Sequence, residues 1–380
     1  MVIFLIAVAF IVKNAIDRHE YSSYRVVQEY GNMAAKTQET ESGSQTAASD
    51  SGATVDASSR YLDVDGHILR YSGDGAALLD GNFQTIWDES FSMTNPKAEC
   101  SGSEILIYDQ MGSSISIYNE KGKVGSFDTG KPILKARVSK ADTAAVLMQD
   151  GEKTGFAYYK ADGTMIAQGQ ASLDSPGYPV DLSISPDAEN VAISYLTMSS
   201  GTSGSTVEFY GFGSGGSEKE NNLIGSLSFP RSIVPVIDYV TDSRAIAVFD
   251  TGFSVVRIGS KPEVSRTVTF SKDIVSAFHD QDHIGFIFSG SGAKPYSLSL
   301  YSTSGTYLTN TDISIHFTEA CVFDDQIVLW NTSEFSVYSL KGFCRFSGKV
   351  SEGTVRQVLR IGTRDYMILT DEKLETVQLK

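Results

Sequence analysis

The stretch Ile133–Gly169, ILKARVSKADTAAVLMQDGEKTGFAYYKADGTMIAQG, decides the fold of this chain. It contains four strand-like segments, at Ile133–Ser139, Ala144–Asp150, Gly155–Tyr159 and Thr164–Gly169. Short turns rich in Asp, Gly and Lys separate these segments, which is the pattern of consecutive β-hairpins. The stretch therefore predicts a small four-stranded sheet whose second strand is its most apolar segment.

Apolar runs like this second segment recur along the 380 residues of the chain, and their starts are 37 to 54 residues apart. A period near 40 with strand-like units is typical of a β-propeller, in which each blade is one four-stranded sheet. We therefore expect an all-β, WD40-like propeller with eight blades, or with seven if the terminal segments merge into one blade. The runs begin at Ile68, Ile105, Ala145, Val191, Ala245, Ile284, Ile327 and Tyr366.

A second signature marks the turn between the third and fourth strands of four repeats. It is a tyrosine followed four positions later by glycine, at Tyr118–Gly122, Tyr159–Gly163, Tyr301–Gly305 and Tyr338–Gly342. We expect the glycine to adopt a positive φ, which hairpin turns require and other residues resist. The tyrosine ends a strand, and we expect it to pack against a neighbouring blade.

The last repeat supplies only three strands, TVRQVLRI, YMILT and ETVQL, before the sequence reaches Lys380. A strand from the N-terminal side commonly completes the final blade of a propeller. The segment RYLDV, Arg60–Val64, is the candidate for that strand.

The first residues contain an apolar run, Val2–Val12, with the sequence VIFLIAVAFIV. We expect residues 1–16 to form a membrane helix, although a bilayer span needs about 20 residues. The run lacks a preceding basic region and a following A-x-A site, both of which a cleaved signal peptide has. We therefore expect an uncleaved anchor whose full helix begins upstream of Met1.

Two further segments separate this anchor from the repeats. Residues 17–36 are polar and aromatic, and we expect them to continue as a juxtamembrane helix. Residues 37–59 are rich in Ser, Thr, Ala and Gly and cannot bury enough apolar surface to become ordered, so they predict a flexible linker. The propeller domain is then expected over residues 60–380, displayed from a membrane.

The composition restricts the class of partner. The net charge is −15, and a strongly acidic surface repels phosphate backbones, so we expect no nucleic-acid partner. Three cysteines at irregular spacing predict neither a disulfide framework nor a metal site of the Cys-x-x-Cys type.

The segment HDQDH contains the strongest candidates for a metal site: His279, Asp280, Asp282 and His283. Two histidines four positions apart on a helix could share a zinc ion. Here the segment lies between two strands, and Asp and Gln are ordinary turn residues. We therefore expect a tight turn, and metal binding is the weaker interpretation.

No sequence motif identifies a catalytic residue or a cofactor. The chain has no G-x-S-x-G, no H-E-x-x-H and no P-loop. The segment DGNFQTIW, Asp80–Trp87, resembles one repeat of the quinoprotein propellers, but only one tryptophan fits that pattern. We expect no cofactor, and the catalytic residues of any enzyme activity are unknown from the sequence.

Several stretches together resemble one known family. The resemblance implies a propeller-like domain on a single membrane anchor, and it brings no activity, ligand or catalytic residue. The family consists of uncharacterised single-pass membrane proteins of Gram-positive anaerobic bacteria, grouped as a domain of unknown function. The stretches are IDRHEYSSYRVV (16–27), TIWDESFSMTNP (85–96), KVGSFDTGKPILKARVS (123–139), YPVDLSISPD (178–187) and SIVPVIDYV (232–240).

These features together predict a single-pass protein of the cell membrane with an extracytoplasmic propeller. Lys13 and Arg18 follow the apolar run and favour the opposite orientation. The expected role is that of a binding, scaffold or sensor module for a protein or an envelope polymer. The alternative is a hydrolase or lyase that acts on an envelope polymer at a site in the propeller channel.

Overall fold

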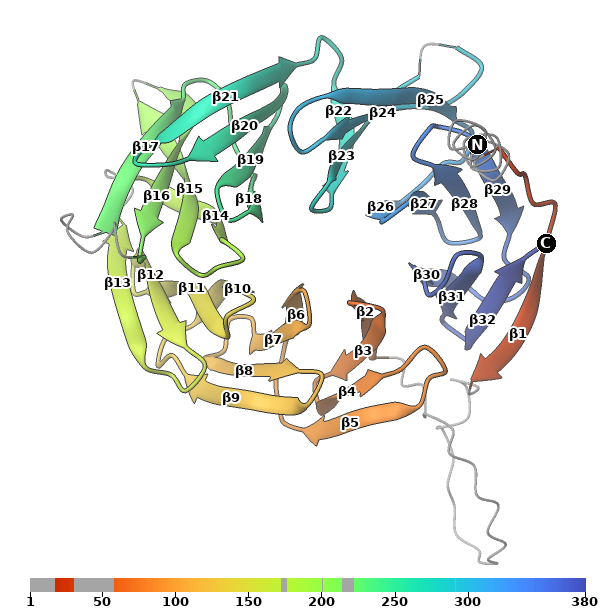
Figure 1. The fold of residues 1–380 in the computed structure, drawn as a ribbon, viewed down its shortest axis with the longest axis horizontal. Coiled ribbons are helices and arrows are strands. Elements are labelled where there is room, and N and C mark those ends of the chain that lie inside the picture. Colours follow the sequence, from red (N-terminus) through yellow and green to blue (C-terminus); the bar gives the residue numbers. More distant parts are fainter. Residues whose placement is uncertain (1–17, 31–57, 172–175, 200, 214–221, 291) are drawn as a thin grey trace, which may run out of the picture. The chain divides into compact units, whose positions relative to one another are not determined.

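The computed structural model describes residues 18–30, 58–171, 176–199, 201–213, 222–290 and 292–380. In this described part the chain forms strands and turns without a helix, and the strands make eight four-stranded sheets. Figure 1 shows these sheets, each with its strands in chain order except for the last. The chain is an all-β, eight-bladed β-propeller, as the recurring apolar runs predict.

The strands divide into two compact units. Unit 2 comprises residues 60–274 and 302–306, and it contains five complete sheets. These sheets are β2 (Arg60–Val64), β3 (His67–Ser72), β4 (Gly75–Leu79) and β5 (Thr85–Ser90); β6 (Pro96–Ser101), β7 (Glu104–Asp109), β8 (Ser114–Asn119) and β9 (Gly122–Asp128); β10 (Ile133–Val138), β11 (Thr143–Asp150), β12 (Lys153–Lys160) and β13 (Met165–Ala171); β14 (Tyr178–Ile184), β15 (Asn190–Ser199), β16 (Thr202–Gly211) and β17 (Leu223–Phe229); β18 (Val236–Thr241), β19 (Arg244–Phe249), β20 (Gly252–Ile258) and β21 (Pro262–Thr269).

Unit 1 comprises residues 1–59, 275–301 and 307–380. It contains nearly all of the other three sheets, the last of which takes one strand from the N-terminal part of the chain. They are β22 (Ile274–His279), β23 (His283–Ser289), β24 (Tyr296–Ser302) and β25 (Tyr307–Ile313); β26 (Glu319–Phe323), β27 (Gln326–Trp330), β28 (Glu334–Ser339) and β29 (Cys344–Lys349); β30 (Val355–Arg360), β31 (Asp365–Thr370), β32 (Leu374–Leu379) and β1 (Tyr24–Tyr30).

The second strand of every sheet is the apolar run found in the sequence. Within a unit, such a strand is buried on both faces where a neighbouring sheet covers each face. β27, for example, is buried along its whole length and contributes to the apolar clusters on both of its sides. Between the second and third sheets, Leu106 and Ile117 pack against Ile133, Val146 and Ala157. A strand buried on both faces needs a continuous apolar run, which is why the runs predict the number of blades.

The tyrosine–glycine signature has the structure that the sequence predicts. Gly122, Gly163 and Gly342 adopt φ values of +115°, +82° and +83° in the turns after the third strands. The tyrosines before them contact the preceding sheet. Tyr118, for instance, stacks on Trp87 with a distance of 4.9 Å between the ring centroids.

The strand that completes the last blade is not the expected one. Arg60–Val64 forms β2, the first strand of the first sheet, and so the candidate proposed from the sequence is wrong. Tyr24–Tyr30 instead forms β1, which pairs antiparallel with β32 at the outer edge of the last sheet (Figure 1). The juxtamembrane helix expected over residues 17–36 is therefore wrong for these residues, since their β-branched and aromatic side chains suit an edge strand.

Residues 1–17 and 31–57 lie outside the described residues. The membrane helix over residues 1–16 and the linker over residues 37–59 therefore stay predictions. In the described part of the chain, no helix is long and apolar enough to cross a bilayer. Because β1 already belongs to the propeller, the expected linker joins β1 to β2 and does not separate the apolar run from the domain.

Two glycines with the same backbone angle allow a test of the blade contacts. Gly66 and Gly163 both have φ of +82°, but a Cβ on Gly66 meets nothing, whereas one on Gly163 would lie 2.7 Å from Phe127 Cβ. We expect Gly66→Ala to cost about 1 kcal/mol from backbone strain alone. Gly163→Ala should cost roughly 2–4 kcal/mol, because the preceding sheet must also shift. Urea unfolding measures the loss of unfolding free energy in both variants. Equal losses would contradict the close contact between Gly163 and Phe127.

Candidate functional site

The turn between β14 and β15 is held in shape by its own side chains. Ser185 Oγ donates to Asp187 Oδ1 at 2.5 Å and accepts the backbone N–H of Asn190 at 2.9 Å. Asp187 Oδ1 also accepts the backbone N–H of Glu189 at 3.0 Å, and Ala188 adopts φ of +64°. The turn lies outside the strand pairing, so these side-chain hydrogen bonds hold its shape. The carboxylate of Asp187 therefore has a defined position at the end of the fourth sheet.

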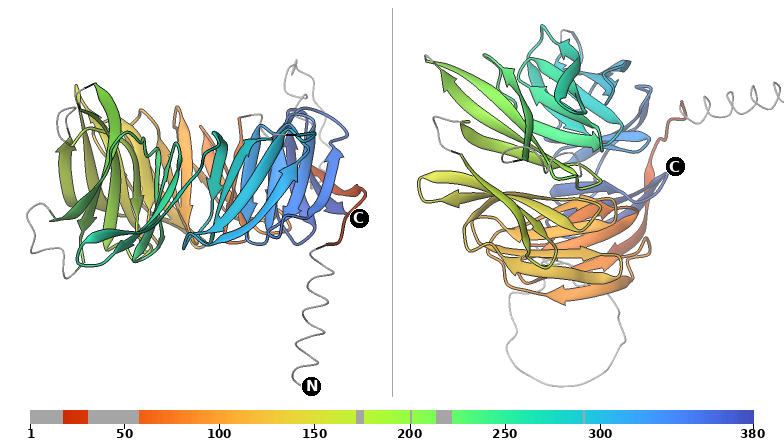
Figure 2. Two further views of the ribbon diagram at one scale, coloured as in Figure 1. Left: turned by 90° about the horizontal axis from the view of Figure 1, so that it is seen from above. Right: turned by 60° about the vertical axis from the view of Figure 1, so that its left-hand side comes forward.

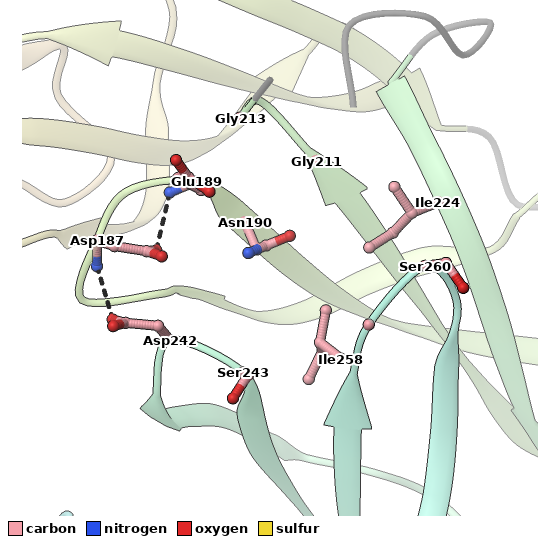
Figure 3. Close-up of a pocket in the computed structure, with 11 residues that line it drawn as sticks. Asp187, Glu189, Asn190, Gly211, Gly213, Ile224, Asp242, Ser243, Ile258 and Ser260 are labelled. Carbon is pink, nitrogen blue, oxygen red and sulfur yellow. Dashed lines mark hydrogen bonds between the residues drawn. The ribbon is translucent and has the colours of Figure 1, made fainter. Parts of the chain in front are cut away.

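The turn between β18 and β19 binds to this turn directly. The backbone N–H of Asp187 donates to Asp242 Oδ1 at 3.0 Å, as Figure 3 shows. Residues 55 positions apart in the sequence are thereby joined at the same end of two neighbouring sheets. The contact brings two carboxylates together on one side of a cavity.

This cavity lies between the fourth and fifth sheets and has a volume of about 490 Å³. Carboxylates line one wall and two isoleucines line another (Figure 3), and the turns that carry the carboxylates are exposed. Its lining residues are Asp187, Glu189, Asn190, Gly211, Gly213, Ile224, Asp242, Ser243, Ile258, Gly259 and Ser260.

The cavity combines negative charge with an apolar surface. Asp187, Glu189 and Asp242 carry carboxylates, and no lining residue carries a positive charge. Ile258 is buried and Ile224 is half-buried, so these two side chains form a fixed apolar wall. A site of this composition suits a ligand that combines an ammonium or guanidinium group with an aliphatic or aromatic group.

A second polar arrangement lies on the first strands of the sheets in unit 2, which contact one another in sequence on the inner side of the unit (Figure 1). The side chain of Asp181 in β14 is 1% exposed, and its Oδ1 lies 2.6 Å from Lys135 Nζ. Asp181 Oδ2 accepts the backbone N–H of Ile237 at 2.8 Å. This carboxylate therefore links three consecutive strands, β10, β14 and β18.

Arg137 extends this network to the second sheet. Its guanidinium forms an ion pair with Glu99 in β6, lies 3.9 Å from Asp181 and donates to the carbonyl of Leu182 at 3.3 Å. Burial by itself would lower the pKa of Arg137, but the carboxylates of Glu99, Asp238 and Asp181 outweigh burial and raise it. The network joins the strands β6, β10 and β14 and places its cations beside its carboxylates. We therefore assign it to the stability of unit 2.

The sequence contains a signal for this network, although no motif marks it. Two of its carboxylates interrupt otherwise apolar first strands, Asp181 in YPVDLSI and Asp238 in VIDYV. Charged residues within apolar strands are rare unless they are paired. The cavity had a weaker signal, since Asp187 belongs to an ordinary turn sequence and Asp242 lies in another repeat.

The HDQDH segment forms the turn between β22 and β23. Asp280 Oδ1 accepts the backbone N–H groups of Asp282 and His283 at 2.8 and 2.6 Å, and His283 Nδ1 lies 3.2 Å from both Asp280 oxygens. The hydrogen bond that the His283 ring donates to the Asp280 carboxylate raises the pKa of His283. His279 ends β22, and the described residues contain no group of three acidic, His or Cys side chains placed to hold a metal ion. Metal binding at this turn stays a prediction.

A carboxyl pair joins the second and third sheets. Glu104 begins β7, and Asp142 lies in the turn before β11 with φ of +55°. Glu104 Oε2 and Asp142 Oδ1 are both shielded from solvent and have no other hydrogen-bond partner among the described residues. Burial, together with a hydrogen bond to the Asp142 carboxyl, raises the pKa of Glu104 to about 8. The carboxyl group of Glu104 therefore favours its protonated form near neutral pH.

Removal of Arg137 tests the stabilising role of the network. We expect Arg137→Met to lower the free energy of unfolding by roughly 2–4 kcal/mol, because half-buried Glu99 loses its partner. The control is Arg257→Met, which removes a 3.2 Å ion pair with Glu263 whose side chains are 72% and 66% exposed. That change should cost no more than about 0.5 kcal/mol. If guanidinium unfolding gave similar losses of free energy for the two variants, the network would add nothing to the stability of unit 2.

The raised pKa of Glu104 predicts a pH dependence of stability. The folded pKa of about 8 exceeds the ordinary value of 4.5, so the folded state binds more protons between these values. Stability from this pair is present at low pH and falls as pH rises from about 4.5 to 8. Glu104→Gln keeps a donor toward Asp142 at every pH, so it should be more stable than the unchanged chain at pH 8, by about 1 kcal/mol. Urea unfolding at pH 5 and pH 8 measures this, and an unchanged pH dependence would contradict it.

Solved structures of known proteins share the fold. Sqt1 of Chaetomium thermophilum, bound to the N-terminus of the ribosomal protein L10, is 10% identical, with a TM-score of 0.53 over 83% of this chain and 94% of that one. The Pan2 WD40 domain of Neurospora crassa is 8% identical, with a TM-score of 0.44 over 75% and 88%. Hsv2 of Kluyveromyces lactis is 14% identical, with a TM-score of 0.41 over 57% and 75%. The similarity to Sqt1 shows that the chain has a WD40-like propeller fold. At sequence identities this low, a structural similarity gives the fold and not the function.

The sequence of the chain also matches a known protein family over nearly its whole length. A search of the curated proteins found no match to the chain. One family model matches residues 17–379, from the segment before β1 to the end of β32. Its range includes β1 together with every repeat, in agreement with a propeller that needs its N-terminal strand. The chain belongs to this family, the family of unknown function DUF5711.

Proposed function

We propose that this chain is a membrane-attached binding module whose unit 2 takes a cationic segment of a partner protein. The observation that carries the proposal is the cavity between the fourth and fifth sheets, with its three carboxylates and its isoleucine wall. The segment would place a lysine side chain or a backbone N-terminus beside Asp187 and Asp242. An adjacent apolar side chain would pack on Ile224 and Ile258.

The electrostatics of the chain support a cationic partner. The net charge of −15 attracts a positive segment over distances up to about a Debye length, and the cavity then adds short contacts. Asp187 and Asp242 are held by backbone hydrogen bonds, so little side-chain entropy is lost when a ligand binds. The isoleucine wall adds the apolar contact that a purely electrostatic surface lacks.

The structural comparison supports a peptide ligand. Sqt1, which has a similar fold, was solved with the N-terminus of another protein bound. A peptide end is a compact ligand that carries one ammonium group and one or two side chains. A cavity of about 490 Å³ has room for such an end, since ligand sites commonly span 300–1,000 Å³.

The membrane part of the proposal is supported by the sequence. The apolar run Val2–Val12 has no charge and is followed by polar residues, as an anchor would be. We place the propeller on the extracytoplasmic side, in keeping with the family that the sequence resembles. The partner would then be an envelope protein or the exposed end of another membrane protein.

A binding assay tests the cavity directly. The probe is a fluorescein-labelled peptide of alternating lysine and leucine with a free N-terminal amine, and fluorescence anisotropy reports its binding. The double variant Asp187→Asn with Asp242→Asn keeps the oxygen acceptors and removes two charges. We expect it to weaken binding roughly three- to tenfold and to reduce the salt dependence. The control is Asp162→Asn, an exposed turn carboxylate outside the cavity, which should bind the peptide as the unchanged chain does.

A crosslinking experiment in the native membrane tests the same site with the natural partner. A photoreactive amino acid at Ser243, which lines the cavity, should capture one dominant protein, and Asp187→Asn with Asp242→Asn should abolish that product. The same label at Glu152, in the turn between β11 and β12, is the control position. Equal binding of the peptide by the double variant and the unchanged chain would overturn the proposal. So would a crosslink that does not depend on the two carboxylates.

A further inference from the structure

The N-terminal residues of the described chain are fixed to unit 1 before β1 begins. Arg18 lies over the ring of Phe343, with 5.1 Å between its guanidinium carbon and the ring centroid. The side chain of Tyr21 is buried in the core of unit 1, and the backbone N–H of Tyr21 donates to the carbonyl of Arg345 at 2.7 Å. Arg345 also donates to the hydroxyl of Tyr21 at 3.1 Å. The chain therefore has a defined path from Arg18 onward.

This path continues along the C-terminal strand. The backbone N–H of Ser22 donates to the carbonyl of Lys380 at 3.0 Å, and the N–H of Lys380 donates to the carbonyl of Ser23 at 2.9 Å. From Tyr24 to Tyr30, β1 then follows β32 along the outer edge of the last sheet (Figures 1 and 2). The two ends of the folded chain are thus held together at the end of the strands where β32 finishes.

The apolar run ends a short distance before this path. Six Cα-to-Cα steps separate Val12 from Arg18, and even a fully extended chain spans at most about 22 Å in that number. The long Ser- and Gly-rich segment cannot add to this reach, because it follows β1. If Val2–Val12 lies in a bilayer, then the backbone of Arg18 lies within about 22 Å of the end of the apolar run, and Phe343 lies next to the Arg18 side chain.

Exposed cations gather at this end of unit 1. Arg18 covers Phe343, and Lys341 is in the same turn as Phe343. The backbone carbonyl of Arg364 accepts the N–H of Leu379, which precedes Lys380 in the sequence. The side chains of Arg18, Lys341, Arg364 and Lys380 are all exposed. Their position contrasts with a net charge of −15 for the whole chain.

Acidic groups lie at the same end as well, and most of them have polar partners. Asp280 bonds to His283, and Asp365 Oδ1 accepts from Gln378 Nε2 at 2.7 Å. Glu20 is exposed next to Tyr21, and Asp282 is exposed in the turn between β22 and β23. Asp324 and Asp325 lie 3.1 and 2.9 Å from the guanidinium of Arg360, which offsets part of their charge.

The opposite end of the last sheet is acidic. Lys373 Nζ lies 2.9 Å from Glu352, 3.4 Å from Glu29 and 3.3 Å from Glu375, so one lysine faces three carboxylates. Glu372, in the turn between β31 and β32, is exposed beside them. The sheet therefore has a cationic end and an acidic end, about 20 Å apart along β31. The segment from Arg18 to Ser23 joins the sheet at the cationic end.

We propose that the cationic end of unit 1 is a membrane-contact surface that binds anionic lipid headgroups through Arg18, Lys341, Arg364 and Lys380. This inference rests on the membrane attachment proposed above. The short reach from Val12 brings this end to the bilayer, and the cations then bind the negatively charged surface. β1 is the strand that connects the membrane-attached segment to the propeller.

A lipid-contact assay tests this surface with the full-length chain in vesicles. The three native cysteines are replaced by serine, and a bimane label is placed by Thr363→Cys or Glu372→Cys, exposed positions in the turns at the two ends of β31. Lipids with a spin label on the headgroup quench a label that they contact. With phosphatidylcholine and phosphatidylglycerol, we expect quenching at Thr363→Cys to be several-fold stronger than at Glu372→Cys.

Flotation of the vesicles separates the two proposals. A chain that does not float with the vesicles contradicts membrane attachment itself. A chain that floats with equal quenching at the two positions, or stronger quenching at Glu372→Cys, overturns the proposed contact surface and leaves the attachment standing.

A charge variant tests the headgroup chemistry without disturbing the core. Lys341→Gln with Arg364→Gln and Lys380→Gln changes only exposed side chains, so the fold should persist. The variant should still float, and its quenching at Thr363→Cys should fall several-fold when phosphatidylglycerol is present. Quenching that is the same in the variant and the unchanged chain would overturn the role of the cations. A matched variant at the acidic end, Asp371→Asn, should leave the quenching unchanged.

Discussion

The structure depends on the burial of both faces of each second strand. A single four-stranded sheet cannot cover its own apolar faces, so each blade is stable only when its neighbours contact it. Leu106 and Ile117 on one sheet and Ile133, Val146 and Ala157 on the next show how this contact is made. The inner strands and the turns can then carry polar groups, because the second strands already hold the sheets together.

This division explains where the two kinds of polar chemistry lie. The network of Arg137, Glu99 and Asp181 is on the first strands, where buried and half-buried charges must be paired, and its cations lie beside its carboxylates. The carboxylates of Asp187 and Asp242 are on turns, where solvent reaches them and a ligand can replace it. A paired network stabilises the unit, whereas a solvated wall beside isoleucines is available for binding.

The sequence predicts those parts of the fold whose cause is local. A strand covered on both faces must be continuously apolar, and a hairpin that needs positive φ selects glycine, so eight blades and turns such as the one at Gly163 can be inferred from residues alone. β1 could not be inferred in this way. Tyr24–Tyr30 is an edge strand with five exposed residues, and it is defined by its pairing with Leu374–Leu379 at the other end of the chain. The cavity is equally non-local, because Asp187 and Asp242 come from different repeats.

The pairing of β1 with β32 has a consequence for the order in which the protein folds. Tyr24 and Leu379 are partners in this pairing, so β1 has no strand to join until almost the whole chain has been synthesised. At about 5–20 residues per second, the N-terminal segment waits for tens of seconds while the five sheets of unit 2 can already form. Throughout that time the β1 segment has no partner strand, and an unpaired strand edge is a site at which nascent chains can associate.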